Sequence, residues 1–418
     1  MMKKEALAIL VGGGPAPGIN GVISAATIEA INRGHRVFGI QNGFSKLLKR
    51  DTSCARELTI AAVSRISRDG GSILGTSRAN PTRSAELLEN VVSSLRELGV
   101  SYLVTIGGDD TASSARAVAV AADGAIRVGH VPKTIDNDLP LPGMVSTFGY
   151  QTAREVGTDI VETLMVDAKT TGRWYLVVAM GRKAGHLALG IGMSAAATLT
   201  LIPEQFEQNL RLTVLADIIV GSILKRMVRN RPYGVVVLAE GLAEILDPAS
   251  IPELSGAERD PHGHIRFAEL DFGGLVKNAV RDRLSEFGIT DMTVVDKDVG
   301  YELRCRAPVA FDREYIRQLG YGVVDFLLTG GNQAIISRQG DQLEPLPFEH
   351  IIDPQTGRSK VRLVDTSSAT YRVAQRYMIR LTTKDLQEGE LVNDIARLTH
   401  LEPETIRERL SPAAALMT

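Results

Sequence analysis

Cysteine is scarce in this sequence, and neither sign of charge is in excess. Among 418 residues only Cys54 and Cys305 are cysteines, so neither a disulfide framework nor a cysteine-based zinc site is expected, and a reducing, cytoplasmic location is predicted. The formal net charge of −2 provides no basic face for nucleic acid, although a local cluster of Arg and Lys could still bind phosphate groups. Small anions are therefore better candidate ligands than polyanions.

The sequence also lacks a hydrophobic run of membrane-spanning length. Its longest mildly apolar stretch, residues 187–202, contains Ser194, Thr198 and Thr200 and falls short of the roughly 20 apolar residues that a membrane helix needs. Near the start, glycines at 12–14 interrupt a short apolar run before it reaches the length of a signal-peptide core. We therefore expect no membrane span. With 44% hydrophobic and 23% charged residues, the chain is an ordinary globular protein with two or three domains.

Compact apolar runs alternate with amphipathic stretches, a pattern typical of a parallel sheet flanked by helices. Strands are predicted at 6–11, 36–40, 102–106, 126–131, 174–179 and 234–238. Helices are predicted at 18–32, 84–98, 111–122, 147–165 and 367–380, and short helices near 384–399 and 403–410. This order predicts an α/β fold with two Rossmann-like three-layer α/β/α domains, the active site between them and a helical C-terminal extension. The predicted domains are 1–146 and 147–300, followed by a return segment at 301–344 and the extension at 345–418.

Two acidic loops follow neighbouring predicted strands. The first is Gly-Gly-Asp-Asp-Thr at 107–111, and the second is Pro-Lys-Thr-Ile-Asp-Asn-Asp at 132–138. Open α/β sheets bind ligands at the carboxyl ends of their strands, and carboxylates with a lysine suit metal and phosphate. Two alternatives remain for the loops taken singly, because the first aspartates could merely cap the next helix and the second loop could be an Asx-rich turn.

A glycine-rich segment, Gly-Gly-Gly-Pro-Ala-Pro-Gly at 12–18, lies between a predicted strand and a predicted helix. Backbone N–H groups there can face a phosphate without side chains in the way. The segment is not a Walker loop, since Ile19 and Asn20 stand where that loop has Lys and Ser or Thr, and Pro17 breaks the dinucleotide-binding fingerprint. A tight strand-to-helix turn remains the alternative.

Taken together, the motifs resemble the phosphofructokinase family in order and spacing over roughly residues 6–330. The family's activity is the Mg²⁺-dependent transfer of a phosphoryl group to the 1-hydroxyl of fructose 6-phosphate. By this resemblance the first predicted domain binds the phosphate donor and the metal, and the second binds the sugar phosphate. The segments that carry the resemblance are Gly13-Gly14 with Ala16-Pro17-Gly18, Gly75-Thr76-Ser77-Arg78, Gly107-Gly108-Asp109, Thr134-Ile135-Asp136-Asn137-Asp138, Met180-Gly181-Arg182 and Glu240-Gly241.

The resemblance implies a role for each motif residue. Asp136 is expected to accept the proton of the sugar hydroxyl, Asp109 to bind Mg²⁺ and Asp138 to orient the metal or the acceptor. Gly14 and Arg78 are expected to contact the donor phosphates, and Thr134 the transferring phosphate or the sugar. Arg182 is expected to contact the transition state, and the sugar is expected to contact Met180, Gly181 and Glu240. Arg173 is expected to contact a site in a neighbouring subunit. A homodimer or homotetramer is therefore expected.

Asp110 and Lys133 bear on the choice of phosphate donor. ATP-using members of the family typically have glycine at both positions. A carboxylate about 4 Å from a phosphate oxygen costs about 4 kcal/mol at an effective dielectric constant of about 20, so Asp110 opposes ATP by charge and bulk. Lys133 supplies a point charge suited to a compact polyanion. The pair resembles the pyrophosphate-dependent branch; a local Asp110–Lys133 ion pair without effect on the donor is the alternative.

Tyr301 and Arg304 also resemble that branch, in which a tyrosine and an arginine contact the sugar 6-phosphate. A further basic ligand is expected upstream, but its place falls near Val295, and Lys297 is the nearest cation. The leading hypothesis is thus a pyrophosphate-dependent phosphofructokinase with pyrophosphate and fructose 6-phosphate as partners. An ATP-dependent enzyme and a non-catalytic sugar-phosphate sensor remain alternatives, and use of sedoheptulose 7-phosphate and regulation stay open.

Overall fold

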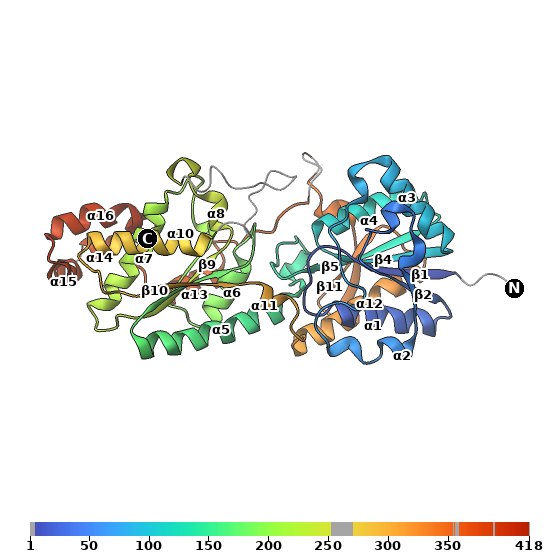
Figure 1. Ribbon diagram of the computed structural model, residues 1–418, viewed down its shortest axis with the longest axis horizontal. Helices are drawn as coiled ribbons and strands as arrows, with labels where there is room; N and C mark the ends of the chain where they lie inside the picture. Colours follow the sequence, from blue (N-terminus) through green and yellow to red (C-terminus); the bar gives the residue numbers. More distant parts are fainter. Residues whose placement is uncertain (1–4, 252–270, 354, 356–358, 388, 418) are drawn as a thin grey trace. The chain divides into compact units, whose positions relative to one another are not determined.

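The computed structural model describes residues 5–251, 271–353, 355, 359–387 and 389–417 (Figure 1). The chain forms two compact units: Met1–Ala153 together with Tyr301–Arg362, and Arg154–Gly300 together with Leu363–Thr418. The segment expected to be a separate return, 301–344, thus lies in the first unit. The polar C-terminal region divides between the units after Arg362.

The first unit contains a mixed sheet in the order β12-β11-β5-β4-β1-β2-β3, with β6 paired to β5. Only the β11–β12 and β2–β3 pairs are antiparallel among its described pairings. Its strands are β1 (Ala6–Val11), β2 (Arg36–Ile40), β3 (Ala55–Leu58), β4 (Val100–Gly107), β5 (Arg127–Thr134), β6 (Phe148–Gly149), β11 (Ala334–Gln339) and β12 (Gln342–Pro347). The parallel strands put the loops after β1, β4 and β5 at one edge of the sheet.

Helices cover both faces of this sheet. The helices of this unit are α1 (Ile19–Asn32), α2 (Ile60–Val63), α3 (Ala85–Glu97), α4 (Asp109–Ala121), α11 (Tyr301–Arg304) and α12 (Ala310–Leu328). Figure 1 shows α1 and α12 on one side of the sheet and α3 and α4 on the other. The alternation of β1 produces this arrangement, since Leu7 and Ile9 join the α1–α12 core while Ala8 and Leu10 join the α3–α4 core.

The second unit has a four-stranded parallel sheet in the order β10-β7-β9-β8 among its described residues. Its strands are β7 (Trp174–Ala179), β8 (Leu199–Leu201), β9 (Gly234–Ala239) and β10 (Val294–Val299). Its helices are α5 (Tyr150–Thr171, whose first turn belongs to the first unit), α6 (His186–Ser194), α7 (Leu212–Met227), α8 (Leu242–Ile245), α10 (Phe272–Glu286), α13 (Ala369–Tyr377), α14 (Thr383–Gln387), α15 (Gly389–Thr399) and α16 (Pro403–Leu416). Helices also lie on both sides of this sheet in Figure 1.

The C-terminal helices pack on the second unit through α7. The apolar side chains of Val392, Ile395 and Leu410 join the same buried core as α7 and α10. Near the end of α7, the Lys225 amino group donates to both carboxylate oxygens of Asp385 at 2.7 Å and to the carbonyl oxygen of Arg380 at 2.8 Å. The predicted helical C-terminal region is therefore present, as a layer on the second unit's core.

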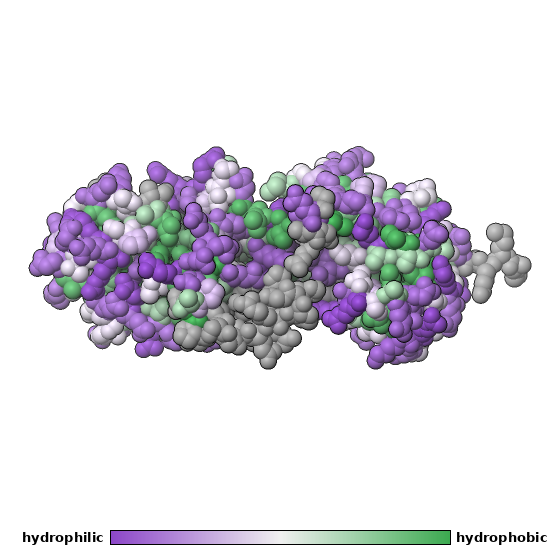
Figure 2. Space-filling model, turned by 90° about the horizontal axis from the view of Figure 1, so that it is seen from above, coloured by the Kyte–Doolittle hydropathy of each residue, from purple (hydrophilic) through white to green (hydrophobic). Residues whose placement is uncertain are grey.

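The surfaces of both units are mostly hydrophilic in the view of Figure 2, with apolar side chains in separate small groups. Within the described ranges, no helix is both long enough and apolar enough to cross a membrane.

Candidate phosphate and metal site

The glycine-rich loop after β1 is tied to two neighbouring segments of the first unit. The Gly12 N–H donates to the carbonyl oxygen of Ile106 at 2.9 Å, and the Gly13 N–H donates to that of Ser77 at 2.9 Å. The Thr76 hydroxyl donates to the carbonyl oxygen of Gly13 at 2.5 Å. The loop therefore lies between the end of β4 and the Gly75–Arg78 motif, whose Arg78 is predicted to hold donor phosphates.

Two glycines let the start of α4 approach the sheet closely. A Cβ on Gly12 or on Gly107 would collide with the hydroxyl group of Thr111 in the first turn of α4. Gly13 has a φ of +79°, a left-handed conformation that glycine adopts without strain. Glycine at these positions is thus required by packing and backbone conformation, whatever ligand the loop binds.

The two aspartates after β4 occupy the first turn of α4. Gly108 is the N-cap and supplies no side-chain capping bond, while Asp109 Oδ1 accepts a hydrogen bond from the Asp110 N–H at 2.9 Å. Asp109 is half-buried and Asp110 is exposed. Neither aspartate is the N-cap residue, so the alternative that their side chains serve as the N-cap of α4 is wrong. Both carboxylates lie near the positive end of the helix dipole, which stabilises their charge.

Lys133 is the central cation of the first unit's site. Its side chain is nearly inaccessible, at 4% exposure, and its amino group donates a hydrogen bond to the carbonyl oxygen of Gly14. Burial, followed by the charges of Arg304 and Arg78, lowers the pKa of Lys133 to about 8, against the opposing effects of Asp136 and Asp109. The mutual repulsion of the three cations favours a bound anion among them.

Arg304 lies over the same loop. A Cβ on Gly14 would be 3.6 Å from Cζ and 3.7 Å from Nη2 of Arg304, and Arg304 Cζ is 5.1 Å from the centroid of the exposed Tyr301 ring. The sequence predicted Arg304 as a ligand of the sugar 6-phosphate and Gly14 as a ligand of the donor. The structure brings these two residues together.

The loop that carries Asp136 is held by side chains. The Asp136 N–H donates to Thr134 Oγ1 at 3.0 Å, and the Thr147 hydroxyl donates to the carbonyl oxygen of Thr134 at 2.7 Å. Asn137, with a φ of +57°, accepts from the Thr147 N–H at 3.1 Å through its side-chain oxygen. The first bond is a turn on the Thr134 hydroxyl and the last joins residues ten positions apart, so neither is the local Asx turn of the alternative. Together the bonds fix the loop that carries the half-buried Asp136 and Asp138 between β5 and β6.

His130, which the sequence did not single out, joins β4 to β5 just before the acidic loops. It is fully buried, with Nε2 3.0 Å from the carbonyl oxygen of Gly107 and Nδ1 2.8 Å from Thr105 Oγ1. A carbonyl oxygen only accepts, so Nε2 carries the proton and Nδ1 accepts from the Thr105 hydroxyl. Burial lowers the pKa of His130 to about 3, and the ring is neutral at ordinary pH.

In the second unit, the Met-Gly-Arg and Glu-Gly motifs follow the adjacent strands β7 and β9. The Gly181 N–H donates to Glu240 Oε2 at 3.0 Å, the Gly241 N–H donates to the carbonyl oxygen of Gly181 at 3.1 Å, and the Met180 N–H donates to that of Val299 at 3.0 Å. Met180, Gly181, Arg182 and Glu240 therefore lie together at one edge of this sheet.

Arg173 lies at the other end of β7. It precedes the six-residue strand and forms an ion pair with Asp167 at 3.9 Å, whereas Met180 follows the strand. At about 3.3 Å per residue, the two ends are about 20 Å apart. Arg173 is thus remote from the motifs of its own unit. Its partner within the described residues is Asp167 of its own unit.

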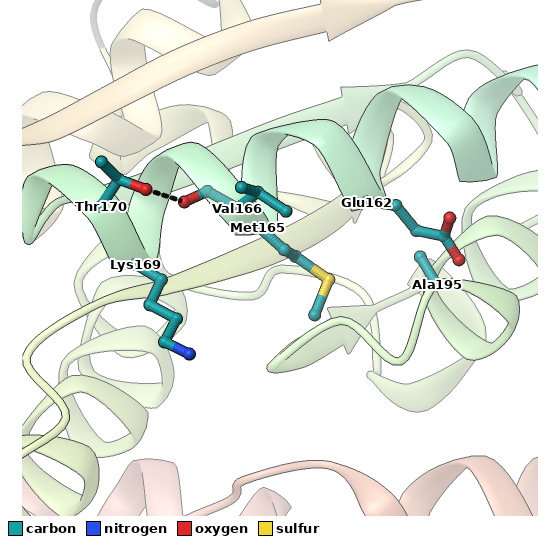
Figure 3. Close-up of a pocket in the computed structure, with 6 residues that line it drawn as sticks. All are labelled: Glu162, Met165, Val166, Lys169, Thr170 and Ala195. Atoms are coloured by element: carbon teal, nitrogen blue, oxygen red, sulfur yellow. Dashed lines mark hydrogen bonds between the residues drawn. The ribbon is translucent and has the colours of Figure 1, made fainter.

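A surface pocket of the second unit has different chemistry. Its lining residues are Glu162, Met165, Val166, Lys169, Thr170 and Ala195 (Figure 3). None of these is a predicted site residue, and its one lysine faces no second cation among the lining residues. The candidate phosphate site therefore rests on the cations gathered at the glycine-rich loop rather than on this cavity.

Comparisons with known proteins point to one family. The sequence profile of the family described as phosphofructokinase matches residues 6–327. The chain is 51% identical over 413 residues to the pyrophosphate–fructose 6-phosphate 1-phosphotransferase of Thermotoga maritima, covering 97% of this chain and 98% of that protein. It is 52% identical over 400 residues to a Naegleria fowleri protein of the same name, covering 93% and 91% respectively.

The fold has a counterpart among solved structures. The chain superposes on the crystal structure of a pyrophosphate-dependent phosphofructokinase from Nitrosospira multiformis with a TM-score of 0.67 and 18% identity. The match covers 99% of this chain and 92% of that one. At this identity the similarity concerns the fold alone, and it confirms the predicted α/β class.

Proposed function

The chain belongs to the phosphofructokinase family, and we propose that it transfers a phosphoryl group from pyrophosphate to the 1-hydroxyl of fructose 6-phosphate. The products are fructose 1,6-bisphosphate and orthophosphate. Donor and product phosphates have similar transfer energies, so the reaction runs in both directions.

The observation that carries the proposal is the position of Lys133. Its buried amino group contacts the carbonyl oxygen of Gly14, and Arg304 and Arg78 are close enough to lower its pKa. A compact anion with several charges gains from all three cations at once. The alternative of an Asp110–Lys133 pair is less well supported, since the carboxylates that raise the Lys133 pKa are Asp136 and Asp109.

The proposed reaction is a direct in-line transfer. The sugar O1 forms a bond to one phosphorus of pyrophosphate while the bond from that phosphorus to the bridging oxygen breaks. The O1 proton passes to the Asp136 carboxylate, and the bridging oxygen leaves with the second phosphorus as orthophosphate. Asp136 then releases its proton to solvent. Lys133 holds the donor, and Arg182 supports the charge of the transition state. Arg304, predicted at the sugar 6-phosphate, is reassigned to the donor because it lies against Gly14.

Asp109 is the proposed Mg²⁺ ligand. Across the described part of the chain, no group of three or more His, Cys, Asp or Glu side chains is placed to hold a metal. Mg²⁺ is commonly bound by one or two carboxylates together with substrate phosphates, so Asp109 beside the cationic loop fits that mode. When bound, the ion would neutralise phosphate charge, and Asp138 would orient it or the acceptor.

The second unit's motif edge is the proposed sugar site. Gly181 and Glu240 are joined by a hydrogen bond there, and Met180 and Arg182 flank Gly181. Arg173 lies at the opposite end of β7, which supports its acting in a second subunit and thus a homodimer or homotetramer. Cys54 and Cys305 are free thiols, in keeping with a cytoplasmic enzyme.

A matrix of donors and acceptors tests the proposal. Purified protein is assayed with pyrophosphate or ATP as donor and fructose 6-phosphate or sedoheptulose 7-phosphate as acceptor, with and without Mg²⁺. Turnover with pyrophosphate and fructose 6-phosphate that requires Mg²⁺ is expected. Turnover with ATP alone would overturn the choice of donor, and sugar-phosphate binding without turnover would indicate a sensor.

A further inference from the structure

Arg362 is the last residue of the first unit and lies beyond residues 6–327, which match the family profile. Although it is an arginine, only 9% of its surface is exposed. In the sequence, Arg362 belongs to no recognised motif. In the structure, it contacts the loop that carries Asp136.

The guanidinium group of Arg362 binds that loop at several points. Nε and Nη2 donate to the carbonyl oxygen of Asn137 at 3.0 Å and 2.9 Å, and Nη1 donates to that of Val145 at 2.9 Å. Nη2 also donates to Asn137 Oδ1, and the backbone N–H of Arg362 donates to the carbonyl oxygen of Asp138 at 2.7 Å. One residue thus fixes both sides of the turn that begins at Asp136.

Only arginine can make this set of contacts. Its planar guanidinium presents donors in a fixed fork, whereas the lysine ammonium is a single point on a flexible stem. Burial lowers the pKa of Arg362 while the charge of Asp138 opposes that effect. A buried guanidinium is stabilised only when its donors are satisfied, and backbone carbonyl oxygens satisfy them here. The contacts of the Arg362 guanidinium therefore depend on the backbone conformation of this turn.

We infer that Arg362 is a positioning residue for the proposed reaction: it holds the 136–145 segment so that the Asp136 carboxylate meets the sugar 1-hydroxyl. This inference rests on the proposed function. Arg362 acts through the backbone of Asn137 and Asp138 and is not itself a catalytic residue. Because Lys133, Gly14 and Arg304 do not depend on these bonds, donor binding should survive its loss.

The test compares Arg362→Ala and Arg362→Lys with a matched control, Arg127→Ala. Arg127 lies at the opposite end of β5, where it also binds a backbone carbonyl oxygen, that of Leu327, at 3.2 Å. For Arg362→Ala, kcat should fall about 100-fold, as expected for a misplaced reacting group, while KM for pyrophosphate stays within about threefold of wild type. Arg362→Lys should regain little of the loss, and Arg127→Ala should keep the wild-type kcat.

Chemical rescue separates positioning from folding. Added ethylguanidinium should raise kcat of Arg362→Ala at least about tenfold and leave wild type and Arg127→Ala unchanged. Hydrogen exchange should be faster in 134–147 of Arg362→Ala and unchanged elsewhere in the first unit. The inference is overturned if kcat is retained, or if its loss matches a loss of folded protein and is not rescued.

Assays of the wild type keep the two proposals distinct. If the wild type uses ATP instead of pyrophosphate, the proposed donor fails, but Asp136 still faces the same hydroxyl and the Arg362 effect is measured on that turnover. If the wild type turns over pyrophosphate and Arg362→Ala does so equally well, the positioning role alone fails. Absence of turnover with either donor overturns both.

Discussion

The side-chain amino group of Lys133 donates a hydrogen bond to the carbonyl oxygen of Gly14, joining the end of β5 to the loop after β1. The contact places a buried cation against the glycine-rich loop, close to Arg304 and Arg78. Its pKa of about 8 makes the charge of this cation sensitive to pH near neutrality.

Pyrophosphate use should therefore weaken in alkaline solution. The charged form of Lys133 predominates below about pH 8 and is lost above it. We expect kcat/KM for pyrophosphate to fall about tenfold per pH unit above that value, because this parameter reports ionisations of the free enzyme. Lys133→Met should have a low, flat profile in this range, and Lys169→Met, at an exposed position on α5, should keep the wild-type profile. A wild-type profile that stays flat to about pH 9.5 would contradict the role of Lys133.

Replacing Asp110 should relax donor selection. Asp110→Gly removes charge and bulk, and we expect ATP turnover to rise at least about tenfold, within the limit set by about 4 kcal/mol of repulsion. Asp110→Asn is the matched control, since it removes the charge and keeps the bulk. A gain in both variants assigns the exclusion to charge, and a gain only in the glycine variant assigns it to size. If neither variant gains ATP turnover, Asp110 does not select the donor.

Asp136→Asn should abolish proton acceptance and keep the shape of the turn. We expect kcat to fall about 10²- to 10⁴-fold, the usual contribution of a general base, with KM for both substrates nearly unchanged. The exposed Asp123, two residues beyond the C-terminal end of α4, offers a control in Asp123→Asn. Single-turnover measurements with pyrophosphate would report the chemical step, and a decrease of less than about threefold would rule out Asp136 as the base.

His130 should make the protein less stable in mild acid. Its pKa of about 3 in the folded state lies below the unfolded value of about 6.5, so between these values the unfolded chain binds a proton that the folded chain does not. The free energy of unfolding therefore rises with pH in this window, and falls by about 1.4 kcal/mol per unit as pH decreases below about 6.5.

Urea unfolding between about pH 7 and pH 5 would measure this effect. His130→Gln should be less stable at neutral pH, because it loses the Thr105 contact, but should show a shallower pH dependence. His350→Gln, at an exposed position, serves as the control. An equally steep dependence in His130→Gln and wild type would mean that other groups cause the acid sensitivity.

The sequence predicted those parts of the fold and site that local pattern determines. The strands at 6–11, 36–40 and 174–179 agree with the structure because each is a compact apolar run bounded by turns or helices. The acidic loops agree in position because they follow such strands. Helix α4 begins at Asp109 rather than at the predicted residue 111, since Gly108 is its N-cap.

Contacts between distant parts of the chain were not predictable. His130 reads as one polar residue in an apolar strand, and only the pairing of β4 with β5 places it against Thr105. Arg362 is separated from Asn137 by 225 positions and belongs to no recognisable motif. Nor does local pattern show that 301–362 joins the first unit, because an apolar run does not specify which sheet it enters.

The connectivity of the first unit has a consequence for protein synthesis. Strands β11 and β12 and helix α12 complete its sheet and core, yet they are translated after most of the second unit. The N-terminal 153 residues therefore leave the ribosome with one edge of β5 and the face later covered by α12 exposed, and they wait for about 150 further residues. Chains released early would carry an unpaired strand edge, which makes premature termination a direct route to aggregation.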